Sequence, residues 1–177
     1  PKGAWRYSPE SKDADTTITG AQLVALFASK NAGIEVPDEA ITKGKQFLID
    51  CQDEKGGFGY TGNSGANLPR TAIGSLILAL DKDTDSKPFK SSLEYLRKNA
   101  RFGDQGHKFY SLYYTAQAMF RASPEDWNTW NLENVRQLQA TQSENGSWTG
   151  NYGTTFATSA ALLSMALNYR YLPIYER

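Results

Sequence analysis

The chain has 177 residues, and its 19 Lys and Arg residues balance its 19 Asp and Glu residues, so the formal net charge is zero. That balance argues against nucleic acid as the main partner and against a polybasic membrane anchor, because both need a surplus of basic residues. Apolar residues make up 40% and aromatic residues 12% of the chain, a composition that predicts one folded domain over 1–177 with a sizeable core.

The spacing of apolar residues predicts an all-α chain, and no strand-like alternation competes with it. Start signals support several helices: Pro37-Asp38-Glu39 places a proline and acids in a first turn, and Ser123-Pro124-Glu125-Asp126 supplies a serine cap followed by proline. The apolar runs, such as 76–80, are far shorter than the ~20 residues of a membrane-spanning helix. We expect seven helices, near residues 16–31, 37–52, 69–81, 86–99, 107–122, 125–141 and 153–169.

These helices alternate between two kinds. The first, third, fifth and seventh are apolar nearly all round, as in 71–80, so each should be covered on most sides. The second, fourth and sixth carry one apolar stripe, and the three stripes are Ile41, Gly44, Leu48 and Cys51, then Phe89, Leu93 and Leu96, then Leu132, Val135 and Leu138. Alternation of this kind predicts two concentric layers, an α/α toroid or a sector of one made of helical hairpins.

A short motif repeats along the chain. Gln52 to Phe58 and Gln142 to Trp148 both read Gln-x-x-x-Gly-x-aromatic and lie 90 residues apart. A degraded copy stands near Asn99–Gly103, and Gly3-x-Trp5 repeats the Gly-x-aromatic part. We expect the glutamine to cap a helix end and bond the next loop, while the aromatic side chain packs, so these residues stabilise the fold rather than contact a substrate.

The repeated motif resembles the QW motif of the terpenoid cyclase and protein prenyltransferase superfamily. The resemblance covers essentially the whole chain, and the ending Tyr171–Arg177 is similar to that of bacterial proteins with a prenyltransferase and squalene-oxidase repeat. It implies an α/α toroid in which a closed ring has about twice as many helices. We therefore expect this chain to be the C-terminal part of a longer protein whose N-terminal repeats are missing, with apolar flanks on the first and last helices that favour self-association.

The segment Asp13-Ala14-Asp15-Thr16-Thr17 resembles the Asp-x-Asp-Asp-Thr motif of class II terpene cyclases. The resemblance implies that Asp15 is a general acid that protonates an alkene or epoxide, with Asp13 as its partner. A carboxylic acid that faces apolar walls keeps its proton, and aromatic faces stabilise a carbocation. Thr16 stands where the family has another aspartate. The alternative, which we favour, is that Asp15 or Thr16 caps the first helix.

A group of aromatic residues on the inner helices could line an apolar cavity, although core packing is the simpler role for any one of them. Arg70 could face a carboxylate or a phosphate of a ligand, or it could be solvated or paired with an aspartate. The aromatic candidates are Tyr110, Tyr113, Tyr114, Phe120 and Phe156.

Metal and cofactor chemistry finds little support in the motifs. Cys51 lies on an outer helix and His107 lacks the pattern that a prenyltransferase zinc site would need, so we expect a buried cysteine, an ordinary loop histidine and no metal. No phosphate-cradling glycine loop or nucleophile elbow is present, and we expect no cofactor.

Two hypotheses of function remain. The first is a binding or scaffold module that holds an apolar or isoprenoid small molecule, a glycan or a protein segment. The second is a class II cyclase, in the manner of squalene-hopene cyclases, that acts on an isoprenoid. The incomplete acid motif favours the first.

Overall fold

Capping side chains and prolines start most of the helices. In the computed structural model, which describes residues 3–100 and 107–169, Asp15, Asn67, Ser86 and Ser123 each accept a hydrogen bond from a backbone N–H in the first turn that follows them. Prolines occupy the first turn of three of these helices. Such residues satisfy amide groups that have no partner within the helix.

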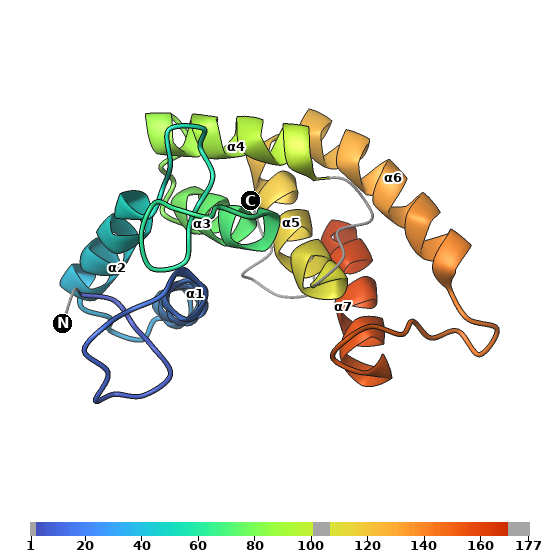
Figure 1. The fold of residues 1–177 in the computed structure, drawn as a ribbon, viewed down its shortest axis with the longest axis horizontal. Helices are drawn as coiled ribbons and strands as arrows, with labels where there is room; N and C mark the ends of the chain where they lie inside the picture. The colour runs from blue at the N-terminus through green and yellow to red at the C-terminus, as the bar shows by residue number, and fades with distance from the viewer. Residues whose placement is uncertain (1–2, 101–106, 170–177) are drawn as a thin grey trace.

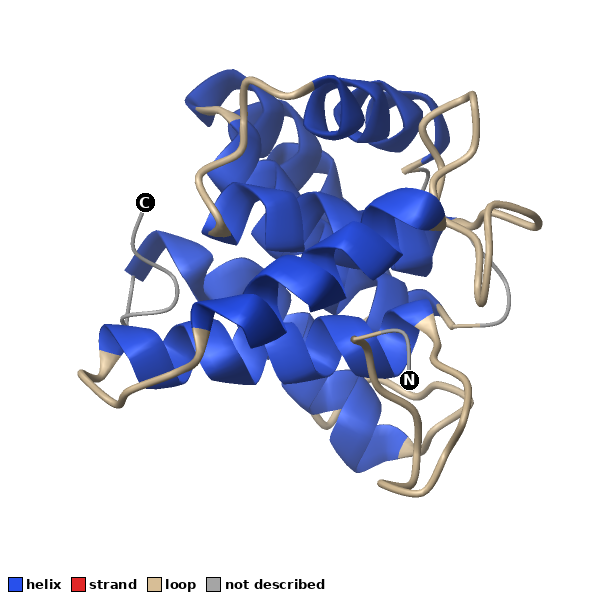
Figure 2. Cartoon of the chain, turned by 90° about the vertical axis from the view of Figure 1, so that its left-hand side faces the viewer, coloured by secondary structure: helices blue, strands red, loops and turns tan. Residues whose placement is uncertain are grey.

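Seven α-helices and a terminal 3₁₀ turn make up the described framework, which contains no β-strand (Figure 2). The all-α fold and the seven helices are therefore confirmed, close to their predicted positions. Their bounds are α1 (Thr16–Asn31), α2 (Asp38–Asp50), α3 (Leu68–Leu80), α4 (Lys87–Asn99), α5 (Lys108–Ala122), α6 (Pro124–Thr141), α7 (Thr154–Ala166) and the 3₁₀ turn Leu167–Tyr169. No helix in this described part is long and apolar enough to cross a bilayer.

The odd-numbered helices pack one after another, α1 on α3, α3 on α5 and α5 on α7, while α2, α4 and α6 each pack against the odd-numbered helix that precedes them. Figure 1 shows the resulting arc, with α4 and α6 along the outer edge and α3 and α5 inside it. Burial follows this order, because every residue of α3 from 71 to 79 is buried, whereas α2 buries only one face. The inner helices are thus the nearly all-apolar ones.

One outer stripe differs from the prediction. On α6 the buried residues are Trp127, Trp130, Asn134 and Leu138, and Leu132 is 76% exposed. Two helical stripes compete on α6, and the one with the two tryptophans faces the core because it removes more apolar area from water. The predicted stripes on α2 and α4 are buried as expected.

The ends of the arc carry exposed apolar side chains. On α7, Phe156, Leu162 and Leu163 are exposed, and on α1 the exposed positions include Ala21 and Ala25. Apolar flanks on the first and last helices were expected from the sequence. The predicted motif copy at 99–103, apart from its first two residues, and the ending 171–177 lie outside the described residues.

The repeated motif forms the same junction in the three copies whose aromatic residue the structure describes. The backbone N–H of the motif aromatic donates to the hydroxyl of a threonine on the next inner helix: Trp5 to Thr19 at 3.0 Å, Phe58 to Thr71 at 3.0 Å and Trp148 to Thr158 at 3.1 Å. Phe58 and Trp148 are buried. This bond fixes the loop on the inner helix in three places along the chain, so the repeat is a structural one.

The motif glutamine bonds its own loop. Gln52 donates to the carbonyl of Gly56 at 3.1 Å and to that of Pro88, at the start of α4, at 2.8 Å. Gln142 donates to Gly146 at 2.8 Å and is exposed. Gly56 and Gly146 have φ of 88° and 82°, a left-handed conformation that glycine adopts without strain. The stabilising role expected for the glutamine agrees with these bonds.

Candidate functional site

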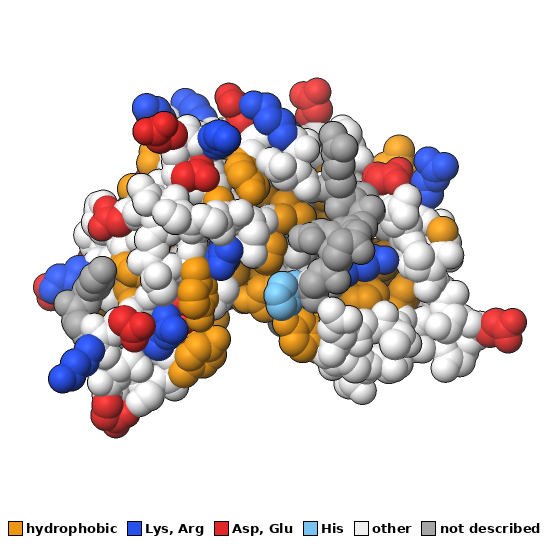
Figure 3. Space-filling model, viewed as in Figure 1, with side chains coloured by type: hydrophobic (Ala, Val, Ile, Leu, Met, Phe, Trp, Pro, Cys, Tyr) orange, Lys and Arg blue, Asp and Glu red, His pale blue; other side chains and the backbone are white. Residues whose placement is uncertain are grey.

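A cavity of about 630 Å³ opens on the concave side of the arc. Its walls come from the loops and first turns at the amino-terminal ends of the four inner helices. Figure 3 shows this side as a notch with hydrophobic side chains around it. The lining residues are Tyr7, Thr17, Ile18, Ala21, Tyr60, Asn67, Pro69, Arg70, His107, Tyr110, Tyr114, Tyr152 and Phe156.

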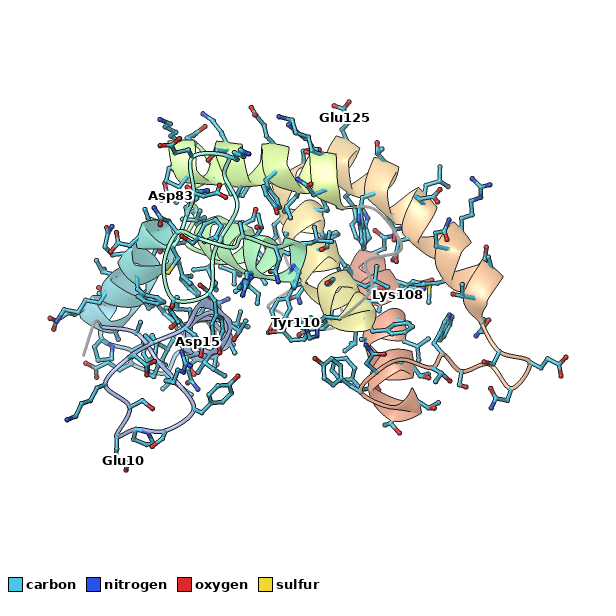
Figure 4. The ribbon with its side chains drawn as sticks, viewed as in Figure 1. Glu10, Asp15, Asp83, Lys108, Tyr110 and Glu125 are labelled. Carbon is cyan, nitrogen blue, oxygen red and sulfur yellow. The ribbon has the colours of Figure 1, made fainter. Side chains whose placement is uncertain are left out.

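Tyrosines of α5 with rings in edge-to-face contact form the floor. The rings of Tyr110 and Tyr114 meet edge to face with centroids 5.0 Å apart, and Tyr113 meets Tyr114 in the same way at 4.9 Å. Burial raises the pKa of both Tyr110 and Tyr114, so these phenols stay protonated and can donate a hydrogen bond. Figure 4 places Tyr110 at the centre of the concave side. The floor is therefore apolar with polar tips.

Two guanidinium groups flank Tyr60 on the α1–α3 side. The Arg6 and Arg70 guanidinium carbons lie 5.2 Å and 5.6 Å from the centroid of the Tyr60 ring, within the range of a cation–π contact. The pKa of Tyr60 is raised to about 12, mainly by a hydrogen bond with Tyr7 and secondly by burial. Tyr60 thus remains a neutral phenol at the mouth of the cavity throughout the physiological pH range.

His107 and Tyr152 close the α7 side. The Tyr152 hydroxyl and His107 Nδ1 lie 2.5 Å apart in a hydrogen bond, and the two rings stack with centroids 5.7 Å apart. Phe156 meets Tyr152 edge to face at 5.4 Å. This contact joins the start of α5 to the start of α7, so it defines the width of the cavity on that side.

Asp15 lies behind the cavity wall, not on it. Its Oδ1 accepts from the Thr17 amide at 2.9 Å, the Thr17 hydroxyl at 2.5 Å and the Ile18 amide at 2.9 Å. Its Oδ2 lies 3.6 Å from Arg6 Nε, and the side chain has no exposed surface. The favoured expectation, that Asp15 caps the first helix, is therefore confirmed.

The other residues of the acidic segment have structural partners. Asp13 is exposed and pairs with Arg6, with Oδ2 and Nη1 3.4 Å apart. Thr16 donates its hydroxyl to the carbonyl of Gly59 at 2.7 Å and fixes the start of α1 on the neighbouring loop. Thr16 thus takes a packing role at the position where the cyclase motif has a carboxylate.

The cavity gathers four of the predicted ligand-binding residues: Arg70, Tyr110, Tyr114 and Phe156. Tyr113 is not among the lining residues and contacts the Tyr114 ring edge to face. Phe120, also a candidate, is buried in the core against Trp127.

Sequence reasoning missed the loop residues of the lining. Tyr7, Tyr60, His107 and Tyr152 all come from segments just before an inner helix. Their place shortly before each predicted inner helix was the available signal, because the inner helices pack side by side and these loops meet at the cavity on the concave side.

Cys51 is buried in the core. Within the described ranges no group of three His, Cys, Asp or Glu side chains could hold a metal ion.

Comparison with known proteins finds no relative: the chain matches no protein-family model and no curated protein. The relationship to the terpenoid cyclase and protein prenyltransferase superfamily therefore stays a prediction from the motifs.

Proposed function

We propose that this protein is a ligand-binding module whose concave cavity holds a small molecule with an apolar body. The observation that carries the proposal is the cavity itself: about 630 Å³, walled by five tyrosines, Phe156 and few charged groups. Sites for small molecules in proteins have volumes of roughly 300–1,000 Å³ and combine aromatic walls with a few polar groups. The volume suits a small molecule better than a glycan chain or a protein segment.

We also propose that the arc is a sector of an α/α toroid. Its support is the alternation of inner and outer helices and the exposed Leu162 and Leu163 on the last inner helix. A further helical hairpin would cover this flank in the same way that α7 covers α5. The cavity, on the concave side, would then face the centre of the ring.

The alternative is a class II cyclase with Asp15 as the general acid and an isoprenoid as substrate. That chemistry needs the acid at the wall of the cavity, within reach of the reacting carbon. Asp15 is wholly buried and directs Oδ1 to the start of α1. We place binding first for this reason.

Titration with N-phenyl-1-naphthylamine, a neutral aromatic probe whose fluorescence rises in apolar surroundings, tests the binding function. We expect saturable binding at one site. Phe156 lies in the cavity wall and is 38% exposed, so Phe156→Ser removes ligand contact without opening the core and should weaken binding about fivefold.

Leu132→Ser is the matched control, since Leu132 is exposed on α6 and lies outside the cavity. It should leave the affinity unchanged. Absence of saturable binding, or equal affinity of the wild type and Phe156→Ser, would remove the proposed function.

A further inference from the structure

The described lining of the cavity carries a cationic side chain and no anionic one. Among the described residues, the lining contains one guanidinium, that of Arg70, one imidazole, that of His107, and no carboxylate. The remaining polar groups are phenols, a threonine and an amide. Because the whole chain has equal numbers of acidic and basic residues, this one-sided lining is a local feature.

Arg70 differs from other arginines of the chain in its partners. Arg6 pairs with Asp13 and Asp15, Arg97 with Asp126, and Arg136 with Glu133. Within the described residues, no carboxylate lies at ion-pair distance from Arg70. Its side chain donates one hydrogen bond to a described residue, from Nη2 to the carbonyl of Gly65 at 2.5 Å.

The surroundings of Arg70 leave its charge poorly compensated. Its Nε is buried and has no acceptor in the described part of the chain, and burial lowers the pKa of the guanidinium. Even so, a guanidinium keeps its charge at neutral pH. A partly desolvated cation without a counter-ion is stabilised when an anion binds beside it.

The helix ends add to this positive potential. Residues at the starts of α1, α3, α5 and α7 line the cavity, and the amino-terminal end of a helix carries a partial positive charge. Asp15 and Asn67 cap α1 and α3, whereas within 3–100 and 107–169 no side chain caps α5 or α7. The two uncapped starts face the same space as Arg70.

We infer that the ligand of this cavity is an anion: an aromatic or other apolar body that carries a carboxylate or a similar oxyanion, with the anionic group at Arg70. The apolar body lies over the Tyr110 and Tyr114 rings and beside Phe156. Guanidinium groups bind planar oxyanions through paired N–H donors, and nearby phenol hydroxyls supply further donors. This inference rests on the proposed binding function and narrows it to a class of ligand.

Two probes that share one skeleton test the charge directly. 8-Anilino-1-naphthalenesulfonate has the N-phenylnaphthylamine body of the neutral probe and adds a sulfonate. We expect Arg70→Gln to weaken binding of the sulfonate about tenfold and to change binding of the neutral probe by less than about twofold. Arg70→Lys keeps the positive charge but loses the planar guanidinium, so its affinity for the sulfonate should lie between those of the wild type and Arg70→Gln.

Arg136→Gln is the matched control, because it removes one positive charge from an exposed position on α6 outside the cavity. It should leave both affinities unchanged. Equal effects of Arg70→Gln on the two probes, or none on the sulfonate, would overturn the inference while the proposed function stands. If neither probe binds the wild type, the proposed function fails and the inference fails with it.

A competition measurement on the unmodified protein decides the matter if Arg70→Gln does not fold. 2-Naphthoate should displace the bound neutral probe at a concentration at least about tenfold lower than 2-naphthylmethanol, which has the same ring system without the charge. Equal displacement by the two compounds would overturn the inference.

Discussion

Removal of the Asp15 carboxylate should destabilise the protein even though Asp15 is a single polar residue at the start of a helix. Its Oδ1 accepts from two backbone amides and one hydroxyl at the start of α1, and its side chain is fully buried. In Asp15→Ala the Thr17 and Ile18 amides lose their acceptor in surroundings that only partly admit water. Loss of an N-cap costs about 1–2 kcal/mol, and amides left unpaired add to it.

We therefore expect Asp15→Ala to lower the free energy of unfolding by about 2 kcal/mol, which is roughly 4–8 °C in Tm for a chain of this size. Urea and thermal unfolding followed by circular dichroism at 222 nm measure both. Asp13→Ala is the control, because the Asp13 side chain is 65% exposed and its partner among the described residues is Arg6, in an ion pair. This variant should lose less than about 0.5 kcal/mol. Equal losses for the two variants would refute the capping argument.

Asp15→Asn separates the cap from the acid. An amide keeps the Oδ1 acceptor and its bonds to the start of α1, but it cannot donate a proton to an alkene. We expect this variant to bind the neutral probe like the wild type and to retain most of the stability. If the protein turns over an isoprenoid and Asp15→Asn abolishes that turnover, the result supports the cyclase alternative, and Asp15 then has a catalytic role in addition to its capping role.

Three further predictions concern the repeats and their flanks. Gln52→Ala should lower the free energy of unfolding by about 1–2 kcal/mol, because the part-buried Gln52 amide donates to two carbonyls. Gln142→Ala loses one exposed hydrogen bond and should lower it by less than about 0.5 kcal/mol. Urea titration of both variants tests the difference. Gly74→Ala should lower the free energy of unfolding by about 1 kcal/mol, because a Cβ there would lie 2.6 Å from the Phe58 ring and the clash outweighs the gain in helix propensity. Gly62→Ala, where no described atom lies near the added Cβ, should leave the free energy of unfolding unchanged in the same assay. The exposed flank of α7 should make the protein self-associate. Sedimentation velocity should then show a weight-average mass that rises with protein concentration, and this mass should be lower in Leu162→Glu. A monomer at every concentration would contradict this prediction.

The helices could be predicted because their signals are local. Ser123 before α6, together with the proline and the acids in its first turn, marks the start of that helix, and apolar spacing marks the buried faces of α2 and α4. The failure at Leu132 shows the limit of spacing alone. Two apolar stripes on α6 have helical periodicity, and only the packing partners decide which one is buried.

The cavity could be predicted only in part. Tyr110, Tyr114 and Arg70 lie on inner helices, where the sequence already predicted an apolar interior. Tyr60 and Tyr152 come from loops that are far apart in the chain, and the side-by-side packing of the inner helices brings them together. No periodicity within a single segment contains that information.

The bond between a motif amide and a threonine hydroxyl has a consequence for how the chain acquires its fold. Each of these three bonds spans only 10 to 14 residues of sequence. Closure of so short a loop takes little chain entropy, and it needs no distant part of the polypeptide. Every junction can therefore form within its own unit, before the rest of the chain has been synthesised.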